Sequence, residues 1–216
     1  MTPLSAANFD RLASSYRRLE FIAFGGALER ARFCFLNALR DCSDILLLGE
    51  GDGRALARLA QVAPRARFHY IDSSAAMLAR AEARLANHPV RPRVIFTHAD
   101  ILAVNLAAAG YDGVTTFFFL DCFEAKQVAA IITQVKYGLR PGATWLFADF
   151  VLPSRKIARL RAQAWLALLY AFFRWQTGIP SRELPPSEEL LRQAGFVCGQ
   201  SCEFSVGLIR SAVFKG

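Results

Sequence analysis

The stretch ILLLGEGDG, residues 45–53, decides the fold of this chain. Its four leading apolar residues are typical of a short strand in a parallel sheet, because such strands are buried on both faces. Gly49, Gly51 and Gly53 permit positive φ angles and let the backbone approach a bound molecule closely. Residues 54–62 then carry apolar side chains at helical spacing. The stretch therefore predicts a strand, a ligand-binding glycine loop and the N-terminus of a helix.

The spacing of the glycines separates two classes of nucleotide-binding loop. The dinucleotide fingerprint GxGxxG needs a third glycine at the position that Arg54 holds here. A bulky arginine at that point argues against NAD or FAD. The compact GxGxG pattern instead resembles motif I of the class I S-adenosylmethionine-dependent methyltransferases.

An acid at the end of the second expected strand extends this resemblance. Residues 67–71, RFHYI, are strand-like and run into Asp72, nineteen residues past the last glycine of the loop. Nucleotide-binding units place a carboxylate about 20 residues after the glycine loop, where it accepts hydrogen bonds from ribose hydroxyls. Ser73 follows as the expected N-cap of a helix. The resemblance assigns Asp72, Ser73 and Met77 to cofactor binding, with an apolar residue near Met77 beside the adenine.

The following segments keep the order of the same family up to about residue 150. A third strand is expected at residues 94–97, and Asp100 and Ile101 follow it. The resemblance implies that Asp100 faces the adenine amino group, with Ile101 beside it. The later elements expected are a strand at 111–116, a helix at 124–137, and a helix stop, a Pro-Gly turn and a fifth strand within GLRPGATWLFADF, residues 138–150.

Together the segments predict one methyltransferase domain over residues 1–216, a length that suits a single large α/β domain. The expected fold is Rossmann-like, with a seven-stranded, mostly parallel sheet and helices on both faces. A C-terminal antiparallel hairpin is expected at residues 196–214, around Gly207. Two helical additions are predicted: an N-terminal cap over residues 1–41 and a lid insertion over residues 153–195.

One position departs from the pattern of the family. The acid that usually ends the first strand, two residues before the first glycine, is Leu47 here. Its absence removes a usual partner of the methionine amino group. Glu50 or Asp52 are alternative partners inside the loop, although a loop acid beside the cofactor carboxylate equally repels it. The loop residues assigned to cofactor binding are Gly49, Glu50, Gly51 and Gly53.

The expected chemistry is an in-line methyl transfer from S-adenosyl-L-methionine that leaves S-adenosyl-L-homocysteine as product. Such a transfer needs alignment and desolvation, and it needs a base only for some acceptors. Asp121, just past the fourth strand, is the candidate base or acceptor-orienting residue, unless it only begins the following helix. The resemblance suggests that Tyr16 reaches the cofactor or substrate, unless it is an ordinary packed tyrosine. Phe117 is assigned to the cofactor site, and residues 117–119 line an acceptor pocket or extend the buried strand.

Residues 155–175 form an aromatic stretch with little polar face and with basic residues on both sides. The family commonly places a lid or dimer contact at this point, so the aromatic content suggests a small, lipophilic acceptor. A buried lid or dimer helix is favoured, since amphipathic helices usually pack in a core. A peripheral helix on anionic lipid remains an alternative, and so does a homodimer.

Composition limits the partners and the compartment. The formal charge is +8, but the arginines are scattered over several expected helices, so no nucleic-acid partner is expected. The five cysteines include no CxxC pair, which favours reduced thiols over a zinc site or disulfides. No secretory signal is recognised, and the longest apolar run, ten residues, is shorter than the ~20 that span a bilayer. A cytoplasmic protein is expected.

The sequence leaves two alternatives to a small-molecule methyltransferase. The basic charge favours RNA or DNA methylation, but residues 116–123 lack the Asn/Asp-Pro-Pro-aromatic sequence that base methylases often carry after the fourth strand. The leucine at position 47 favours a binding protein that kept the fold and lost turnover.

Overall fold

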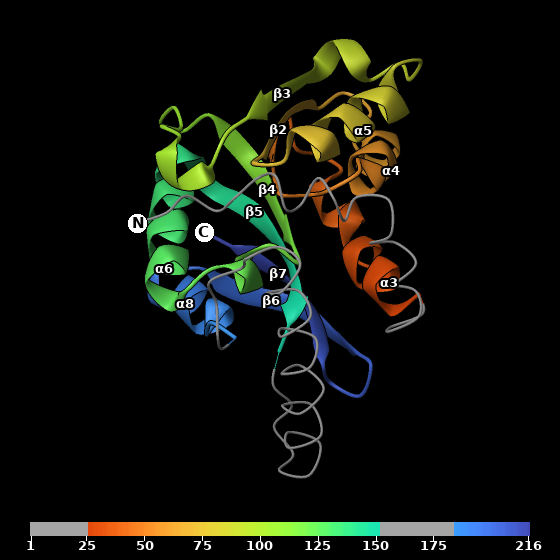
Figure 1. The fold of residues 1–216 in the computed structure, drawn as a ribbon. Coiled ribbons are helices and arrows are strands. Elements are labelled where there is room, and N and C mark those ends of the chain that lie inside the picture. Colours follow the sequence, from red (N-terminus) through yellow and green to blue (C-terminus); the bar gives the residue numbers. More distant parts are fainter. Residues whose placement is uncertain (1–25, 152–183) are drawn as a thin grey trace.

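The computed structural model describes residues 26–151 and 184–216. In this part of the chain, helices cover both faces of a seven-stranded sheet (Figure 1). The strand order is β3-β2-β1-β4-β5-β7-β6. Strands β1 to β5 all run parallel to one another. Strand β7 lies between β5 and β6 and is antiparallel to both. The arrangement confirms the predicted sheet, including its C-terminal antiparallel hairpin.

The observed elements lie close to the expected ones. The strands are β1 Asp44–Leu48, β2 Arg67–Asp72, β3 Val94–His98, β4 Tyr111–Phe117, β5 Leu139–Phe150, β6 Val197–Phe204 and β7 Ile209–Lys215. The α-helices are α3 Ala27–Phe33, α4 Arg54–Val62, α5 Ala75–Leu85, α6 Ala125–Gly138 and α8 Ser187–Gln193. Short 3-10 helices are η1 Leu36–Leu39, η2 Arg91–Arg93, η3 Ile101–Ala103 and η4 Leu120–Cys122.

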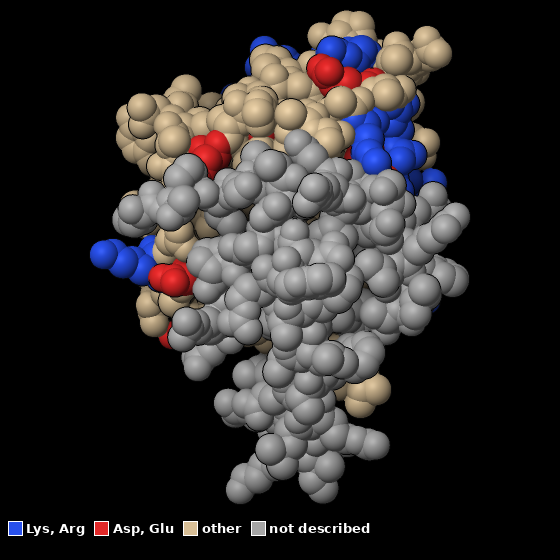
Figure 2. Space-filling model, in the orientation of Figure 1, with Lys and Arg blue, Asp and Glu red and all other residues tan. Residues whose placement is uncertain are grey.

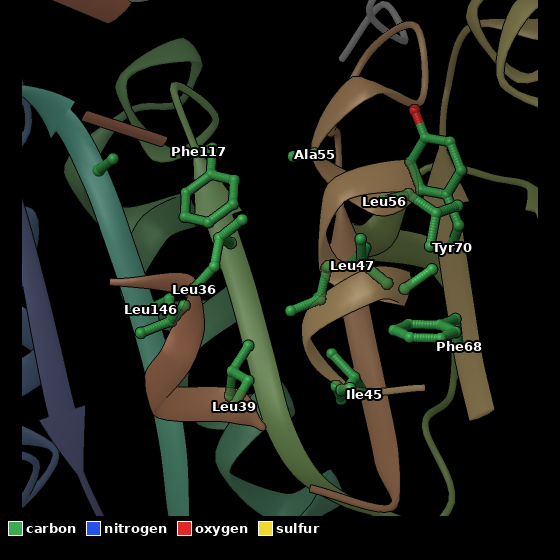
Figure 3. Close-up of a cluster of buried hydrophobic side chains, with 14 of the residues drawn as sticks. Leu36, Leu39, Ile45, Leu47, Ala55, Leu56, Phe68, Tyr70, Phe117 and Leu146 are labelled. Carbon is green, nitrogen blue, oxygen red and sulfur yellow. The ribbon is translucent and has the colours of Figure 1, made fainter. Parts of the chain in front are cut away.

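Strand β1 shows how the sheet divides the core. Ile45 and Leu47 pack in the cluster under α3, α4 and α5, where Figure 3 shows Leu47 beside Leu56 and Ile45 near Phe68. Leu46 and Leu48 point to the opposite cluster, under α6 and α8. None of these four β1 side chains is more than 1% exposed. The run is apolar throughout because helices cover both faces of the strand.

The described segment before β1, part of the predicted helical cap, consists of α3 followed by the 3-10 helix η1. Helix α3 ends at Phe33, and Phe35 has φ −117°, so the chain leaves the helix before η1 begins. This break turns Leu36 and Leu39 into the core, where they are at most 3% exposed. The gain in burial of two leucines outweighs the helical propensity of the segment.

Several predictions concern residues outside the described ones. Tyr16, most of the predicted cap over 1–41, the aromatic stretch 155–175 and most of the predicted lid over 153–195 belong to this group. Within residues 26–151 and 184–216, no helix is both long and apolar enough to cross a bilayer.

The strand order places the site. The order reverses between β1 and β4, because the chain moves outward from β1 to β3 and returns to β4 on the other side. In open α/β sheets, ligands bind at such a switch point, beyond the carboxyl ends of the strands. The loops after β1, β2, β4 and β5 all emerge at this edge, since these four strands are parallel.

Candidate active site

The glycines of the loop after β1 serve two different purposes. Gly49, Gly51 and Gly53 all have positive φ, between 57° and 83°. A Cβ at Gly49 would lie 2.1 Å from the Phe119 ring, and one at Gly53 would lie 2.8 Å from the Cα of Ala81 in α5. A Cβ at Gly51 would meet no described atom within 4 Å. The first and third glycines permit close packing inside the protein, and the second borders open space.

Glu50 points back toward the N-terminus of α4. Its Oε1 accepts a 2.6 Å hydrogen bond from the backbone N–H of Ala55, and the residue is 7% exposed. Its Oε2 is also buried and accepts no hydrogen bond from the residues that the structure describes. Burial raises the pKa of the Glu50 carboxyl to about 7. The loop therefore holds a buried carboxyl group with one unused oxygen.

Asp72 ends β2 and is tied to the glycine loop through Tyr70. The Tyr70 hydroxyl lies 2.7 Å from Asp72 Oδ2 and 2.7 Å from the carbonyl oxygen of Gly51. Asp72 Oδ1 accepts a 2.9 Å hydrogen bond from the Ser74 N–H, and burial raises the pKa of the Asp72 carboxyl. In Figure 3 the Tyr70 hydroxyl extends along the end of β2. Tyr70 was not a sequence candidate, although its position two residues before Asp72 puts both on one face of the strand.

The expected N-cap at Ser73 is wrong, because Ser74 caps α5. Its Oγ accepts from the Met77 N–H at 3.2 Å, and its backbone is extended. The hydrogen bond from Ser74 N–H to Asp72 turns the chain so that the helix begins one residue later than expected. The Ser73 carbonyl oxygen instead lies 3.0 Å from His98 Nε2. The cofactor contacts assigned to Ser73 and to the half-buried Met77 stay predictions.

The other predicted cofactor residues lie at the ends of β3 and β4. Asp100 caps η3 by accepting a 3.0 Å hydrogen bond from the Leu102 N–H. Ile101 and Phe117 have buried side chains, 4% and 3% exposed, in the clusters on opposite faces of the sheet. The structure thus brings Asp100 to the same edge as Asp72 and places Ile101 and Phe117 in the core.

Two buried carboxyl groups meet at the ends of β4 and β5. Asp121, in η4, is 8% exposed, and Asp149, in β5, is 2% exposed. The Asp121 backbone N–H donates a 3.1 Å hydrogen bond to Asp149 Oδ2. Burial raises the pKa of Asp121 to about 6, and burial together with the Asp121 charge raises that of Asp149 well above its usual range. Two carboxyl groups this close disfavour the doubly ionised state, so the pair keeps its last proton to a higher pH than a single exposed carboxyl would.

Asp149 was also missed by the sequence reasoning. Its signal was a single acid in the otherwise apolar end of the fifth strand, WLFADF. The pKa of the neighbouring Cys122 thiol is raised by burial and by the charges of Asp121, Asp149 and Asp72. The carboxyl ends of β2, β4 and β5 therefore share one electrostatic environment.

A cavity of about 520 Å³ lies beside the end of β5, between α8 and the β6–β7 hairpin. Phe147, Phe150 and Val151 form part of its wall, together with Leu184. On its polar side, Arg210 Nε lies 2.6 Å from Glu188 Oε1. Phe147 and Phe150 lie in the same strand as Asp149, but neither Asp149 nor Asp121 belongs to the cavity lining.

The charged surface of the described residues is mixed. Figure 2 shows Lys and Arg side chains gathered on one side, with carboxylates close to them. Among the described residues, Arg84 pairs with Asp52 at 2.9 Å, and Arg91 pairs with Glu82 at 3.4 Å. These ion pairs neutralise part of the positive surface that a nucleic acid would need.

Comparison with known proteins identifies the relatives of this chain. The profile of a family described as "Methyltransferase domain" matches residues 45–142. An uncharacterized methyltransferase of Mycobacterium tuberculosis is 32% identical over 145 residues, which cover 66% of this chain and 70% of that protein. The matched segment contains the glycine loop, Asp72 and the strands that carry them.

Solved structures show the same fold at low identity. An O-methyltransferase family 2 protein from Planctomyces limnophilus, in complex with apigenin, has a TM-score of 0.71 and 17% identity, with 99% of this chain and 62% of that chain covered. A 1,6-didemethyltoxoflavin-N1-methyltransferase from Burkholderia thailandensis, with bound 1,6-didemethyltoxoflavin and S-adenosylhomocysteine, has a TM-score of 0.69 and 18% identity, with 98% and 87% covered. This chain thus spans less than two thirds of the Planctomyces protein. By sequence and fold together, the chain belongs to the class I S-adenosylmethionine-dependent methyltransferases.

Proposed function

We propose that this protein transfers a methyl group from S-adenosylmethionine to a small, lipophilic acceptor. The observation that carries the proposal is the meeting of three features at one edge of the sheet. They are the glycine loop, the Asp72 carboxyl and the Asp121–Asp149 pair. Membership in the methyltransferase family supports the donor, and the cavity beside β5 supports the acceptor.

The described residues fit the cofactor. The open space at Gly51 lets the backbone approach a ligand, and the Asp72 carboxyl stands at the usual place for binding ribose hydroxyls. The Tyr70 hydroxyl links the Gly51 carbonyl oxygen to the Asp72 carboxyl, so the glycine loop and the end of β2 keep a fixed distance. Asp100 is the residue expected to recognise the adenine. When bound, S-adenosylmethionine supplies a methyl group on a positively charged sulfur.

The acid pair gives the chain a means to orient the acceptor and to take up its proton. Asp121 and Asp149 lie side by side with raised pKa values, so their charge state responds to a neighbouring polar group. Asp121, after β4, is the member nearer the glycine loop, since it follows Phe119 and Phe119 packs on Gly49. In this proposal Asp121 accepts a hydrogen bond from the acceptor, and Asp149 positions Asp121 through its backbone N–H.

The cavity beside β5 supports a small acceptor with apolar surface. Binding sites for small molecules are commonly concave, mostly apolar and supplied with a few polar groups. The phenylalanines at positions 147 and 150 provide apolar wall, and Arg210 and Glu188 provide polar groups. Two of the solved relatives hold small aromatic molecules, apigenin and 1,6-didemethyltoxoflavin. These observations favour a small molecule over a polynucleotide.

The proposal is tested in two stages, binding and transfer. Calorimetry is expected to detect S-adenosylhomocysteine binding to the wild type and at least ~10-fold weaker binding to Asp72→Asn, which keeps the shape of the side chain and removes its charge. Asp41→Asn, an exposed acid before β1, is the matched control and should bind normally. Absence of binding to the wild type would end the proposal.

In the second stage, the protein is incubated with methyl-labelled cofactor and a cell extract. The label is expected in the fraction that partitions into organic solvent, and Asp72→Asn should reduce it. Label that precipitates with RNA or DNA would instead support base methylation. A protein that binds the cofactor but labels nothing in the extract would be a binding protein without turnover.

A further inference from the structure

We infer that Glu50 is the carboxylate that receives the α-ammonium group of the cofactor in this protein. The inference rests on the proposed function and concerns the amino-acid end of the cofactor. The acid that relatives usually carry at the end of the first strand is Leu47 here. A cofactor with an ammonium group still needs an anionic partner, since a buried cation without one is costly.

The position that the missing acid would have held is now part of the core. Leu47 is fully buried and belongs to the cluster that also contains Leu56 and Tyr70 (Figure 3). The side chain packs under α4 and offers no polar atom. The anionic partner must therefore come from another residue near the glycine loop.

Asp52 is the other acid of the loop, and both of its oxygens are already engaged. Oδ1 lies 2.9 Å from Arg54 Nε, and Oδ2 lies 2.9 Å from Arg84 Nη2. Arg84 also donates a 2.8 Å hydrogen bond to the Asp52 carbonyl oxygen. These contacts hold Asp52 toward α5 and satisfy its charge. It is a poor candidate for a further cation.

Glu50 has the opposite properties. One oxygen caps α4 through the Ala55 N–H, and the other is buried without a hydrogen-bond partner among the described residues. A buried acceptor left unsatisfied costs about 1–3 kcal/mol and is uncommon in folded proteins. The residue precedes Gly51, where a Cβ would meet no described atom within 4 Å. An ammonium group bound at this loop would satisfy the remaining oxygen.

The charges around Glu50 agree with this assignment. Burial raises its pKa to about 7, while the Ala55 N–H, the Arg32 charge from α3 and the Leu56 N–H favour the ionised form. The Asp52 charge opposes ionisation, and Tyr70 on β2 is close enough for its own pKa to be raised in part by Glu50. A bound ammonium would favour the carboxylate, so ligand binding near pH 7 is expected to release a fraction of a proton.

A purely structural role for Glu50 makes a different prediction. If the side chain only caps α4, an amide serves almost as well, because the Ala55 N–H needs one acceptor oxygen. Glu50→Gln would then leave ligand binding unchanged. Repulsion between Glu50 and the cofactor carboxylate would make the same substitution tighten binding.

The experiment compares two ligands that differ in the amino-acid part. S-adenosylhomocysteine has the ammonium and carboxylate, and 5′-methylthioadenosine has the adenosine and thioether but neither charged group. Calorimetry measures the binding of both ligands to the wild type, to Glu50→Gln and to the control Asp52→Asn. We expect Glu50→Gln to weaken the binding of S-adenosylhomocysteine at least ~10-fold and to change the affinity for 5′-methylthioadenosine less than about twofold. We expect Asp52→Asn to lower the affinity for both ligands about equally or to leave both affinities unchanged.

Each other outcome has a defined meaning. Unchanged or tighter S-adenosylhomocysteine binding to Glu50→Gln overturns the inference, and so does an equal loss of both ligands, which would place Glu50 in the structure of the loop. Failure of both ligands to bind the wild type contradicts the proposed function itself. As a second readout, binding heats at pH 7 in two buffers of different ionisation enthalpy should show more proton release from wild type than from Glu50→Gln.

Discussion

Single residues in and around the loop after β1 fix the backbone of the candidate site by close packing. Gly49 allows the Phe119 ring to rest on the backbone, which closes the end of β4 over the end of β1. Phe118 next to it has φ 53°, an uncommon value for a bulky residue. Its ring packs 5.3 Å from Phe150 and has the Arg32 guanidinium 5.0 Å from its centroid. Tight aromatic packing thus supports a strained turn directly beside the candidate site.

Substitution of two glycines separates packing from backbone strain. Both Gly49→Ala and Gly51→Ala place alanine at positive φ, which costs about 1–2 kcal/mol of unfolding free energy. Gly49→Ala also forces a Cβ into the Phe119 ring, so a further ~1–3 kcal/mol is expected for that variant alone. Urea unfolding measures both. Adding Phe119→Ala should remove most of the difference, and equal losses for the two glycine variants would contradict the close contact.

Among the elements, the helices that follow the strands are held by side-chain caps at their first turns. The Ser74 hydroxyl caps α5, and Glu124 with Gln127 forms a capping box at the start of α6. These caps fix where each helix begins relative to the loop before it. The loop after β2 is set in this way, because Asp72 holds the Ser74 N–H and Ser74 in turn holds the helix.

Two adjacent serines test this cap. Ser74→Ala is expected to lower the unfolding free energy by about 1 kcal/mol, since it removes the acceptor of the Met77 N–H. Ser73→Ala, the matched control, should stay within about 0.5 kcal/mol, because its contact with His98 uses the backbone carbonyl. Chemical denaturation without ligand is the measurement. A larger loss for Ser73→Ala would restore the original N-cap assignment.

For the whole molecule, buried acids and surface ion pairs respond to pH in opposite directions. Arg67 and Arg140 hold the pKa of Asp44 below its usual value, so the stability from these ion pairs is present above about pH 4 and is lost on acidification. Glu50 and Asp121 have raised values instead. A raised carboxyl pKa gives stability that is present below the unfolded value and is lost as the pH rises through the folded one.

We therefore expect the protein without ligand to be most stable in mild acid. Glu50 alone, with its pKa raised from 4.5 to about 7, should lower the unfolding free energy by roughly 3 kcal/mol between pH 4.5 and pH 8. Glu50→Gln should remove that part of the decline and leave the part due to Asp121 and Asp149. Urea unfolding across this pH range is the measurement, and parallel curves for the two proteins would contradict a buried, protonated Glu50.

The fold could be predicted well because its signals are local. The apolar run before Gly49, the acid at position 72 and the hairpin turn at Gly207 each depend on a few neighbouring residues. The errors came where distant contacts decide. The helix before β1 breaks because Leu36 and Leu39 reach the core, and the N-cap moves from Ser73 to Ser74 because Asp72 takes up a neighbouring N–H.

By itself, the sequence determined the succession of strands along the chain and the place of the glycine loop, since these follow from periodicity and from residue types at fixed spacing, and the resemblance of its motifs to a known family indicated the cofactor class. Only the tertiary structure decided which acids have an unused oxygen. Arg84, 32 residues away, engages Asp52, whereas Oε2 of Glu50 accepts no hydrogen bond from residues 26–151 and 184–216. Likewise, Asp149 meets Asp121 across 28 residues, because β4 and β5 are parallel neighbours whose carboxyl ends share one edge. Contacts between distant segments leave no local pattern in the chain, so only the folded structure reveals them.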